Sequence, residues 1–290
     1  MNNNIEHFKR PMKAEMRSHN VQSVPIIRPK YGSGQYLHLY DKLPTSLDAL
    51  CDLIQRQLIH PWSGKPQPKN RQYTPQKNIT VATMLEQLIE LNPAGLVMSR
   101  TLDQCVIGAC RENALLLTSI LRYQGVPARM RAGWAKYISS KPDQFADHWV
   151  VEVWHEAENR WMWVDSDPKK IDFAPNEFQA AGDAWLDIRQ QRASPETYRA
   201  KTDLFYVKLN LGHDFNTILG TGPHYWEAPP LFHIPLDQMG KRHLHLVDQV
   251  ATLLKAPDQN LAKLQNLQSK EPLLQGLESA WPVFAKTVYG

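Results

Sequence analysis

One cysteine stands where a nucleophile would be useful. Cys110 heads the stretch CRENALLLTSILRY, whose apolar residues recur at helical spacing. A thiol attacks a carbonyl as its thiolate, which the positive end of a helix dipole and a neighbouring imidazolium both favour. Taken alone, Cys110 is better interpreted as a buried, inert thiol, because free cysteine is among the most buried residue types.

A base and an orienting carboxylate are available downstream of this cysteine. His148 opens the apolar and aromatic run HWVVEVWH, and Asp165 and Asp167 lie at the end of the run RWMWVDSD. Two such runs with a short polar connection predict an antiparallel hairpin, in which residues of matching parity share one face. His148 and an aspartate can therefore be neighbours, and parity admits both aspartates.

An oxyanion formed during the attack needs hydrogen-bond donors. The backbone N–H of Cys110 is one candidate, because the first N–H groups of a helix have no intrahelical acceptor. Gln104, six residues upstream, is the other. Its distance from the cysteine is similar to the Gln to Cys spacing of papain-like proteases.

The elements that must position these residues follow from hydrophobic periodicity. Helices are predicted at residues 45–58, where Thr45 and Asp48 resemble a capping box, and at 80–91. The helix that begins at Cys110 is apolar around much of its circumference, so we expect it to be central and largely buried. The sequence around Gly125 should end this helix, because glycine and a following proline are strong stop signals.

Three runs rich in β-branched and aromatic residues follow, at 128–138, 148–155 and 160–167. They predict an antiparallel sheet packed against the cysteine-bearing helix, and the expected fold class is therefore α+β. Further along, the sequence predicts a helix at 178–191, a loop-rich segment at 195–240, and closing helices at 243–256 and 260–268.

These elements suggest three parts of the chain. Residues 1–35 are polar and turn-rich, which favours a flexible N-terminal arm. Residues 36–190 contain the candidate nucleophile, base and carboxylates and form the expected catalytic core. Residues 191–290 form the expected loop-rich and helical extension, packed on that core.

Three motifs in order resemble the transglutaminase-like superfamily: the cysteine-headed helix continuing into GVPAR, the segment DHWVVEVW, and RWMWVDSD. The segments LIHP and AGDAW make the sequence similar to a group of bacterial transglutaminase-like proteins. The resemblance spans about residues 40 to 190 and implies a papain-like fold with a Cys-His-Asp triad. Carried over, it implies Cys110 as nucleophile, His148 as general base and acid, and Asp165, four residues after Trp161, as orienting carboxylate. Asp167, four residues after Trp163 and before a proline, is the alternative.

Aromatic residues on the predicted strands could line a substrate groove. Trp149 and Trp134 are the candidates for substrate binding, although tryptophans at strand spacing more often belong to the core. Arg129 could hold an acidic substrate group, but an arginine near a strand start more often braces the structure. Cys51 and Cys105 are expected to be packed, unreactive thiols.

Composition narrows the function classes. The chain of 290 residues has 42% hydrophobic and 21% charged residues and a net charge of +4. Its lysine and arginine residues are scattered along the sequence and do not form one basic patch. We therefore expect no nucleic-acid partner and no membrane span, and a cytoplasmic location. The three cysteines and eleven histidines form no familiar zinc or calcium pattern, so neither a metal nor a cofactor is expected.

The expected function is cysteine-dependent acyl transfer or hydrolysis at the amide bond of a protein, peptide or small amide. Hydrolysis would make the protein a peptidase or amidase, whereas attack by an amine would make it an acyltransferase. The alternative is a catalytically silent binding or scaffold protein that keeps the same fold. The sequence sets neither the acceptor nor the oligomeric state.

Overall fold

The computed structural model describes residues 32–74, 80–97, 99–198 and 204–279. Almost all of the predicted N-terminal arm, residues 1–31, lies outside this part of the chain. The chain divides into two compact units, residues 1–130 with 150–173 and residues 131–149 with 174–290. The domain boundaries expected at residues 35 and 190 stay predictions.

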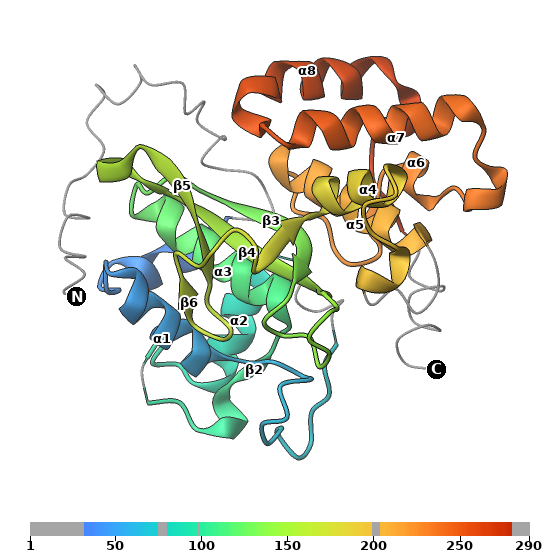
Figure 1. The fold of residues 1–290 in the computed structure, drawn as a ribbon. Helices are drawn as coiled ribbons and strands as arrows, with labels where there is room; N and C mark the ends of the chain where they lie inside the picture. Colours follow the sequence, from blue (N-terminus) through green and yellow to red (C-terminus); the bar gives the residue numbers. More distant parts are fainter. Residues whose placement is uncertain (1–31, 75–79, 98, 199–203, 280–290) are drawn as a thin grey trace. The chain divides into compact units, whose positions relative to one another are not determined.

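The first unit begins with the short 3-10 helix η3 (Gly34–Tyr40), followed by α1 (Leu47–Gln57) and α2 (Val81–Leu91), all three visible in Figure 1. The N-cap predicted at Thr45 is wrong by one residue, because the side chain of Ser46 accepts the N–H of Ala49 at 3.3 Å. In α2, the side chain of Thr80 caps the helix, and the helix ends before Asn92.

The helix α3 (Cys110–Tyr123) is the centre of the first unit. Every one of its residues except Tyr123 is buried, which confirms the expectation of a central helix. Both α1 and α2 pack against it. Gly125 adopts a φ of 79°, and the N–H of Val126 donates to the carbonyl of Leu121, which is the glycine-terminated helix end that the sequence predicts.

Two short strands precede α3, one directly after α1 and the other just before Cys110. The strands β1 (Leu58–Ile59) and β2 (Val106–Ile107) are parallel, with Ile59 opposite Ile107. The pairing continues as the N–H of Gly108 donates to the carbonyl of Ile59 at 3.0 Å. The 3-10 helix η5 (Leu102–Gln104) immediately precedes β2. The segment before Cys110 is therefore held against the segment that follows α1.

A five-stranded sheet has the order β6-β5-β4-β3-β7, in which β5 pairs antiparallel with both β4 and β6, and β3 with β7. The predicted strands are β3 (Ala128–Ala135), β4 (Ala146–His155) and β5 (Arg160–Asp165), and the expected α+β class is confirmed. The 3-10 helix η6 (Glu156–Glu158) and Asn159, at a φ of 51°, connect β4 to β5. Two outer strands complete the sheet: β6 (Lys170–Ile171), which the sequence did not predict, and β7 (Phe178–Ala180). The helix predicted at 178–191 is therefore wrong for its first three residues, which form β7 before α4 begins at Ala181.

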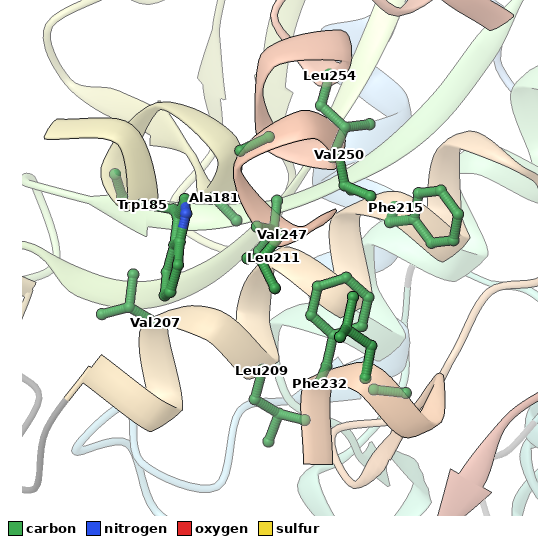
Figure 2. Close-up of a cluster of buried hydrophobic side chains, with 14 of the residues drawn as sticks. Ala181, Trp185, Val207, Leu209, Leu211, Phe215, Phe232, Val247, Val250 and Leu254 are labelled. Atoms are coloured by element: carbon green, nitrogen blue, oxygen red, sulfur yellow. The ribbon is translucent and has the colours of Figure 1, made fainter. Parts of the chain in front are cut away.

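Helices dominate the second unit. The predicted helices are confirmed as α4 (Ala181–Arg189), α7 (Lys241–Leu254) and α8 (Pro257–Lys270). Figure 2 shows the apolar core of this unit, in which Trp185, Phe215, Phe232 and Val250 come from four different helices. Shorter elements complete the unit: η7 (Pro195–Tyr198), β8 (Glu227–Ala228), α6 (Pro230–His233), η8 (Leu236–Gln238), η9 (Pro272–Leu274) and β9 (Glu278–Ser279).

The predicted loop-rich character of residues 195–240 is wrong for α5 (Leu204–Ile218). The helix escaped detection because it is buried on all sides from Val207 onward, so its sequence has no alternation of polar and apolar faces. Its glycine reflects the same crowding, since a Cβ at Gly212 would lie 2.6 Å from the ring of Phe232.

A buried ion pair fixes α5 to β3. Arg131 donates through Nε and Nη2 to the two carboxylate oxygens of Asp214, at 2.8 and 2.9 Å. The same carboxylate accepts the backbone N–H of Ala132 at 3.1 Å. Both side chains are almost fully buried, so each charge depends on the other for solvation.

We expect Asp214→Ala to lower the free energy of unfolding by about 3–5 kcal/mol, because it leaves the buried guanidinium of Arg131 without this carboxylate. Asp172→Ala is the matched control. Asp172 accepts a similar two-bond contact from Arg160, but both side chains are about 40% exposed, so a loss of at most about 1 kcal/mol is expected. Denaturant unfolding of both variants makes the comparison, and equal losses would contradict it.

Candidate active site

Cys110 is the first residue of α3, as the sequence predicts. Its side chain is 7% exposed, whereas that of Cys51 is 0% exposed. The preceding residue, Ala109, has extended backbone and no side chain able to cap the helix. The capping acceptor has to come from elsewhere, and its source is the first feature that sequence analysis missed.

That acceptor is the carboxylate of Glu112. Its Oε2 accepts the N–H of Ala109 at 2.9 Å, directly beside the peptide that joins Ala109 to Cys110. The same oxygen accepts the hydroxyl of Tyr73 at 2.9 Å, and Oε1 faces Nη1 of Arg111 at 3.1 Å. Glu112 and Arg111 are fully buried. A buried, charged hydrogen-bond network therefore positions the start of the cysteine helix.

Burial governs the titration of this network. It raises the pKa of Glu112, while Arg111, the hydroxyl of Tyr73 and the N–H of Ala109 act to lower it. Burial also raises the pKa of Tyr73 well above its ordinary value, and the nearby charges of Glu112 and Cys110 add to this. Tyr73 is therefore a hydrogen-bond donor at neutral pH, and its phenol lies within electrostatic range of the Cys110 thiol.

The other two cysteines are packed thiols, as predicted. Burial raises the pKa of Cys51 to about 12, and the charge of Asp165 adds to this. The sulfur of Cys105 contacts the carbonyls of Arg56 and Thr101, and burial raises its pKa too. The three cysteines form no disulfide. Cys51 and Cys105 are thus internal references for thiol reactivity.

The two candidate aspartates have different environments. Asp165 is the last residue of β5, is 2% exposed, and accepts the backbone N–H of Asp167 at 3.0 Å. Asp167 follows the strand, and its carboxylate lies 3.7 Å from Nε2 of His60. Gln55 donates to the carbonyl of Asp167. The structure thus brings the two aspartates together, with Asp165 the more buried.

His148 lies near the start of β4 and belongs to the second unit. It is 2% exposed, and its ring packs edge-on against Tyr137 with centroids 5.9 Å apart. The neighbouring Asp147 accepts hydrogen bonds from the hydroxyl of Tyr206 at 2.7 Å and the amide of Asn210 at 2.9 Å. Burial raises the pKa of Asp147, whereas these donors and His148 act to lower it. Helix α5 thus secures the backbone that carries His148.

Gln104 has a structural function that the sequence did not reveal. Its side-chain oxygen accepts the N–H of Thr101 at 3.1 Å and the amide of Asn92 at 3.3 Å. These bonds cap η5 and tie it to the end of α2. Its contribution to an oxyanion site stays a prediction.

The tryptophans predicted to bind substrate are enclosed within the second unit. Trp134 is 0% exposed and packs against Tyr198 and Tyr206, and Trp149 is 1% exposed and packs against His213 and Tyr225. Rings covered in this way contribute packing area. A substrate contact by either ring stays a prediction.

Arg129 is a brace, as favoured from the sequence. It forms an ion pair with Glu152, and its guanidinium lies 4.1 Å from the ring centroid of Trp161. Within the described residues, no cluster of three or more His, Cys, Asp or Glu side chains could hold a metal ion. No helix in the same part of the chain is long and apolar enough to span a bilayer.

Comparison with known proteins bears on these residues. Residues 77–168 match the transglutaminase-like superfamily, and this segment contains Cys110, His148 and both candidate aspartates. This segment belongs to the transglutaminase-like superfamily. No curated protein matches the chain.

A solved structure of a proposed cysteine protease from Cytophaga hutchinsonii shares 17% identity with the chain, with a TM-score of 0.31. The match covers 53% of this chain and 44% of that protein, so the chain spans less than half of its length. The assignment of a transglutaminase-like core therefore depends on the family match and on the fold described above.

Tyr73→Phe should lower the free energy of unfolding by about 1–3 kcal/mol, because it removes a hydrogen bond to a buried carboxylate. Tyr123→Phe is the control. Its hydroxyl also bonds an aspartate, Asp41, but at an exposed position, and its removal should leave stability unchanged within error. Denaturant unfolding measures both variants. A loss in Tyr123→Phe as large as in Tyr73→Phe would show that burial of the Glu112 network is not what matters.

Proposed function

We propose that this protein is a cysteine-dependent enzyme that transfers or hydrolyses an acyl group at an amide bond, with Cys110 as nucleophile. The observation that carries the proposal is the place of Cys110 as the first residue of a buried helix, inside the segment that matches the transglutaminase-like superfamily. A thiol at that position meets the positive end of the helix dipole, which favours its reactive thiolate form.

The strands supply candidates for the remaining roles. Side chains alternate along β4, so His148 lies on the strand face of Glu152. Glu152 is paired with Trp163 of β5, and Asp165 shares the face of Trp163. This alternation supports His148 as general base and acid and Asp165 as the carboxylate that orients it. The burial of Asp165 favours it over Asp167.

In the proposed first step, the Cys110 thiolate attacks the carbonyl carbon of the amide and forms a tetrahedral oxyanion. Backbone N–H groups at the start of α3 are the nearest donors for that oxygen. The C–N bond then breaks, and the imidazolium of His148 gives its proton to the leaving amine. The products of this step are a thioester on Cys110 and a neutral amine.

The second step resolves the thioester. Water or a second amine attacks its carbonyl carbon while neutral His148 takes the proton of the attacking group. The C–S bond breaks, releasing a carboxylic acid or a new amide and returning the thiolate-imidazolium pair. The chemistry of the acceptor separates a peptidase or amidase from an acyltransferase, and product analysis by mass spectrometry distinguishes the two.

Selective alkylation of Cys110 tests the proposed pair. Between about pH 5 and 7, iodoacetamide should modify Cys110 at least tenfold faster than Cys51 or Cys105, because an ordinary thiol titrates near 8.5 and is mostly protonated there. His148→Ala should slow the modification of Cys110 itself at least about tenfold in this pH range. Peptide mass spectrometry of the quenched protein gives the rate for each cysteine.

The two other cysteines serve as controls in the same molecule, since burial raises the pKa of Cys51 to about 12 and raises that of Cys105. Equal, slow modification of all three cysteines would contradict the proposal. It would favour the alternative, a binding or scaffold protein that keeps a transglutaminase-like core without its chemistry.

The orienting carboxylate can be identified by paired substitutions. Asp165→Asn should slow acylation of Cys110 by an activated ester at least about a hundredfold, as expected when the carboxylate that orients a catalytic histidine is neutralised. Asp167→Asn should slow it by no more than about threefold. The reverse ranking would assign the role to Asp167. Acylation rates come from stopped-flow release of the ester's leaving group, with circular dichroism to verify folding.

A further inference from the structure

An exposed tryptophan lies beside the cysteine helix and has no role in the fold described so far. Trp62 is 59% exposed, the highest value among the large hydrophobic residues in the described part of the chain. Single exposed apolar side chains are ordinary on protein surfaces and need no explanation. The position of Trp62 relative to Cys110 is what makes it notable.

The parallel pair β1–β2 carries both residues to the same end. Ile59 lies opposite Ile107, and the N–H of Gly108 bonds the carbonyl of Ile59. Trp62 comes three residues after Ile59, and Cys110 comes three residues after Ile107. Because parallel strands run in the same direction, the segments that follow β1 and β2 leave the pair at the same end. The register thus places Trp62 and Cys110 three residues beyond the same end of the β1–β2 pair.

A side-chain contact independently supports this proximity. The rings of Trp62 and Tyr73 meet edge to face, with centroids 5.6 Å apart. The hydroxyl of Tyr73 bonds the Glu112 carboxylate that caps the start of the cysteine helix. Trp62 is therefore connected to the backbone of that helix start through the phenol ring of Tyr73 and the carboxylate of Glu112.

The segment that holds Trp62 is fixed by its own hydrogen bonds. The N–H of Trp62 donates to Nδ1 of His60 at 3.2 Å, and Ser63 and Gln67 both donate to the carbonyl of His60. Since Nδ1 accepts, the proton of neutral His60 is on Nε2, which faces Asp167 at 3.7 Å. The ring of His60 supports the indole with centroids 5.7 Å apart. An indole held in this way is preorganised to contact a ligand.

We propose that Trp62, supported by His60 and Tyr73, forms a substrate subsite that binds an aromatic or large aliphatic side chain next to the acyl carbonyl attacked by Cys110. The inference rests on the proposed function and names its substrate class, a peptide-like acyl donor with a bulky apolar residue at the reacting carbonyl. A flat, largely exposed indole favours such side chains over small or charged ones. The parallel direction of β1 and β2 places the subsite and the thiol at the same end of the pair.

The test uses matched electrophiles on the full-length protein. N-acetyl phenylalanyl and N-acetyl alanyl chloromethyl ketones are compared, and the rate of Cys110 alkylation by each is divided by its rate with iodoacetamide. The phenylalanyl probe should react about fivefold to tenfold faster than the alanyl probe in the wild type, as a stacked aromatic pair would give. Trp62→Ala should bring the two rates within about twofold, and Trp62→Phe should retain part of the preference.

Leu37→Ala is the matched control, because Leu37 is 50% exposed and lies in η3, away from the β1–β2 pair; its preference should equal that of the wild type. No preference in the wild type, an unchanged preference in Trp62→Ala, or no reaction of Cys110 with either probe would overturn the subsite. The proposed function is judged separately, by the dependence of the iodoacetamide rate on His148. Because both probes react with the same thiol, the ratio of their rates does not depend on whether Cys110 is activated. The ratio therefore tests the subsite alone.

Discussion

The structure of the first unit depends on how the backbone N–H groups at the buried start of α3 find hydrogen-bond acceptors. The first N–H groups of α3 have no intrahelical acceptor, and Ala109 offers no side chain to cap them. The buried carboxylate of Glu112 accepts one of these groups, the N–H of Ala109, and its charge is in turn stabilised by Arg111 and Tyr73. The position of Cys110 is therefore fixed by an ionic network. Removing any member of this network would leave another member buried without its hydrogen-bond or charge partner.

The same network connects the candidate nucleophile to its surroundings. Tyr73, from the segment between α1 and α2, donates a hydrogen bond to Glu112. The β1–β2 pair holds the segment before Cys110 against the segment that follows α1. In the second unit, the contact of Asp214 with Arg131 attaches α5 to β3. The contact of Asn210 with Asp147 attaches α5 to β4, next to His148. Each unit thus holds its candidate catalytic residue through charged or polar contacts rather than through apolar packing alone.

Packing also explains which aromatic residues are available for binding. Trp134 and Trp149 are enclosed by side chains of the second unit, whereas Trp62 packs against His60 and Tyr73 and is still 59% exposed. Tryptophans on central strands fill the space between a sheet and its helices, so strand patterning is a poor guide to ligand contact. A loop fixed by internal hydrogen bonds can present an aromatic ring without burying it.

Local signals in the sequence determined the central helix, its stop at Gly125, the three main strands and the inert character of Cys51, because periodicity and turn chemistry act over a few residues. The family motifs also selected the candidate triad. Only the tertiary structure decided the roles of α5, Glu112, Tyr73 and Trp62. A helix buried on every side has no amphipathic period, and a carboxylate, a phenol and an indole from distant segments meet only when the chain has folded.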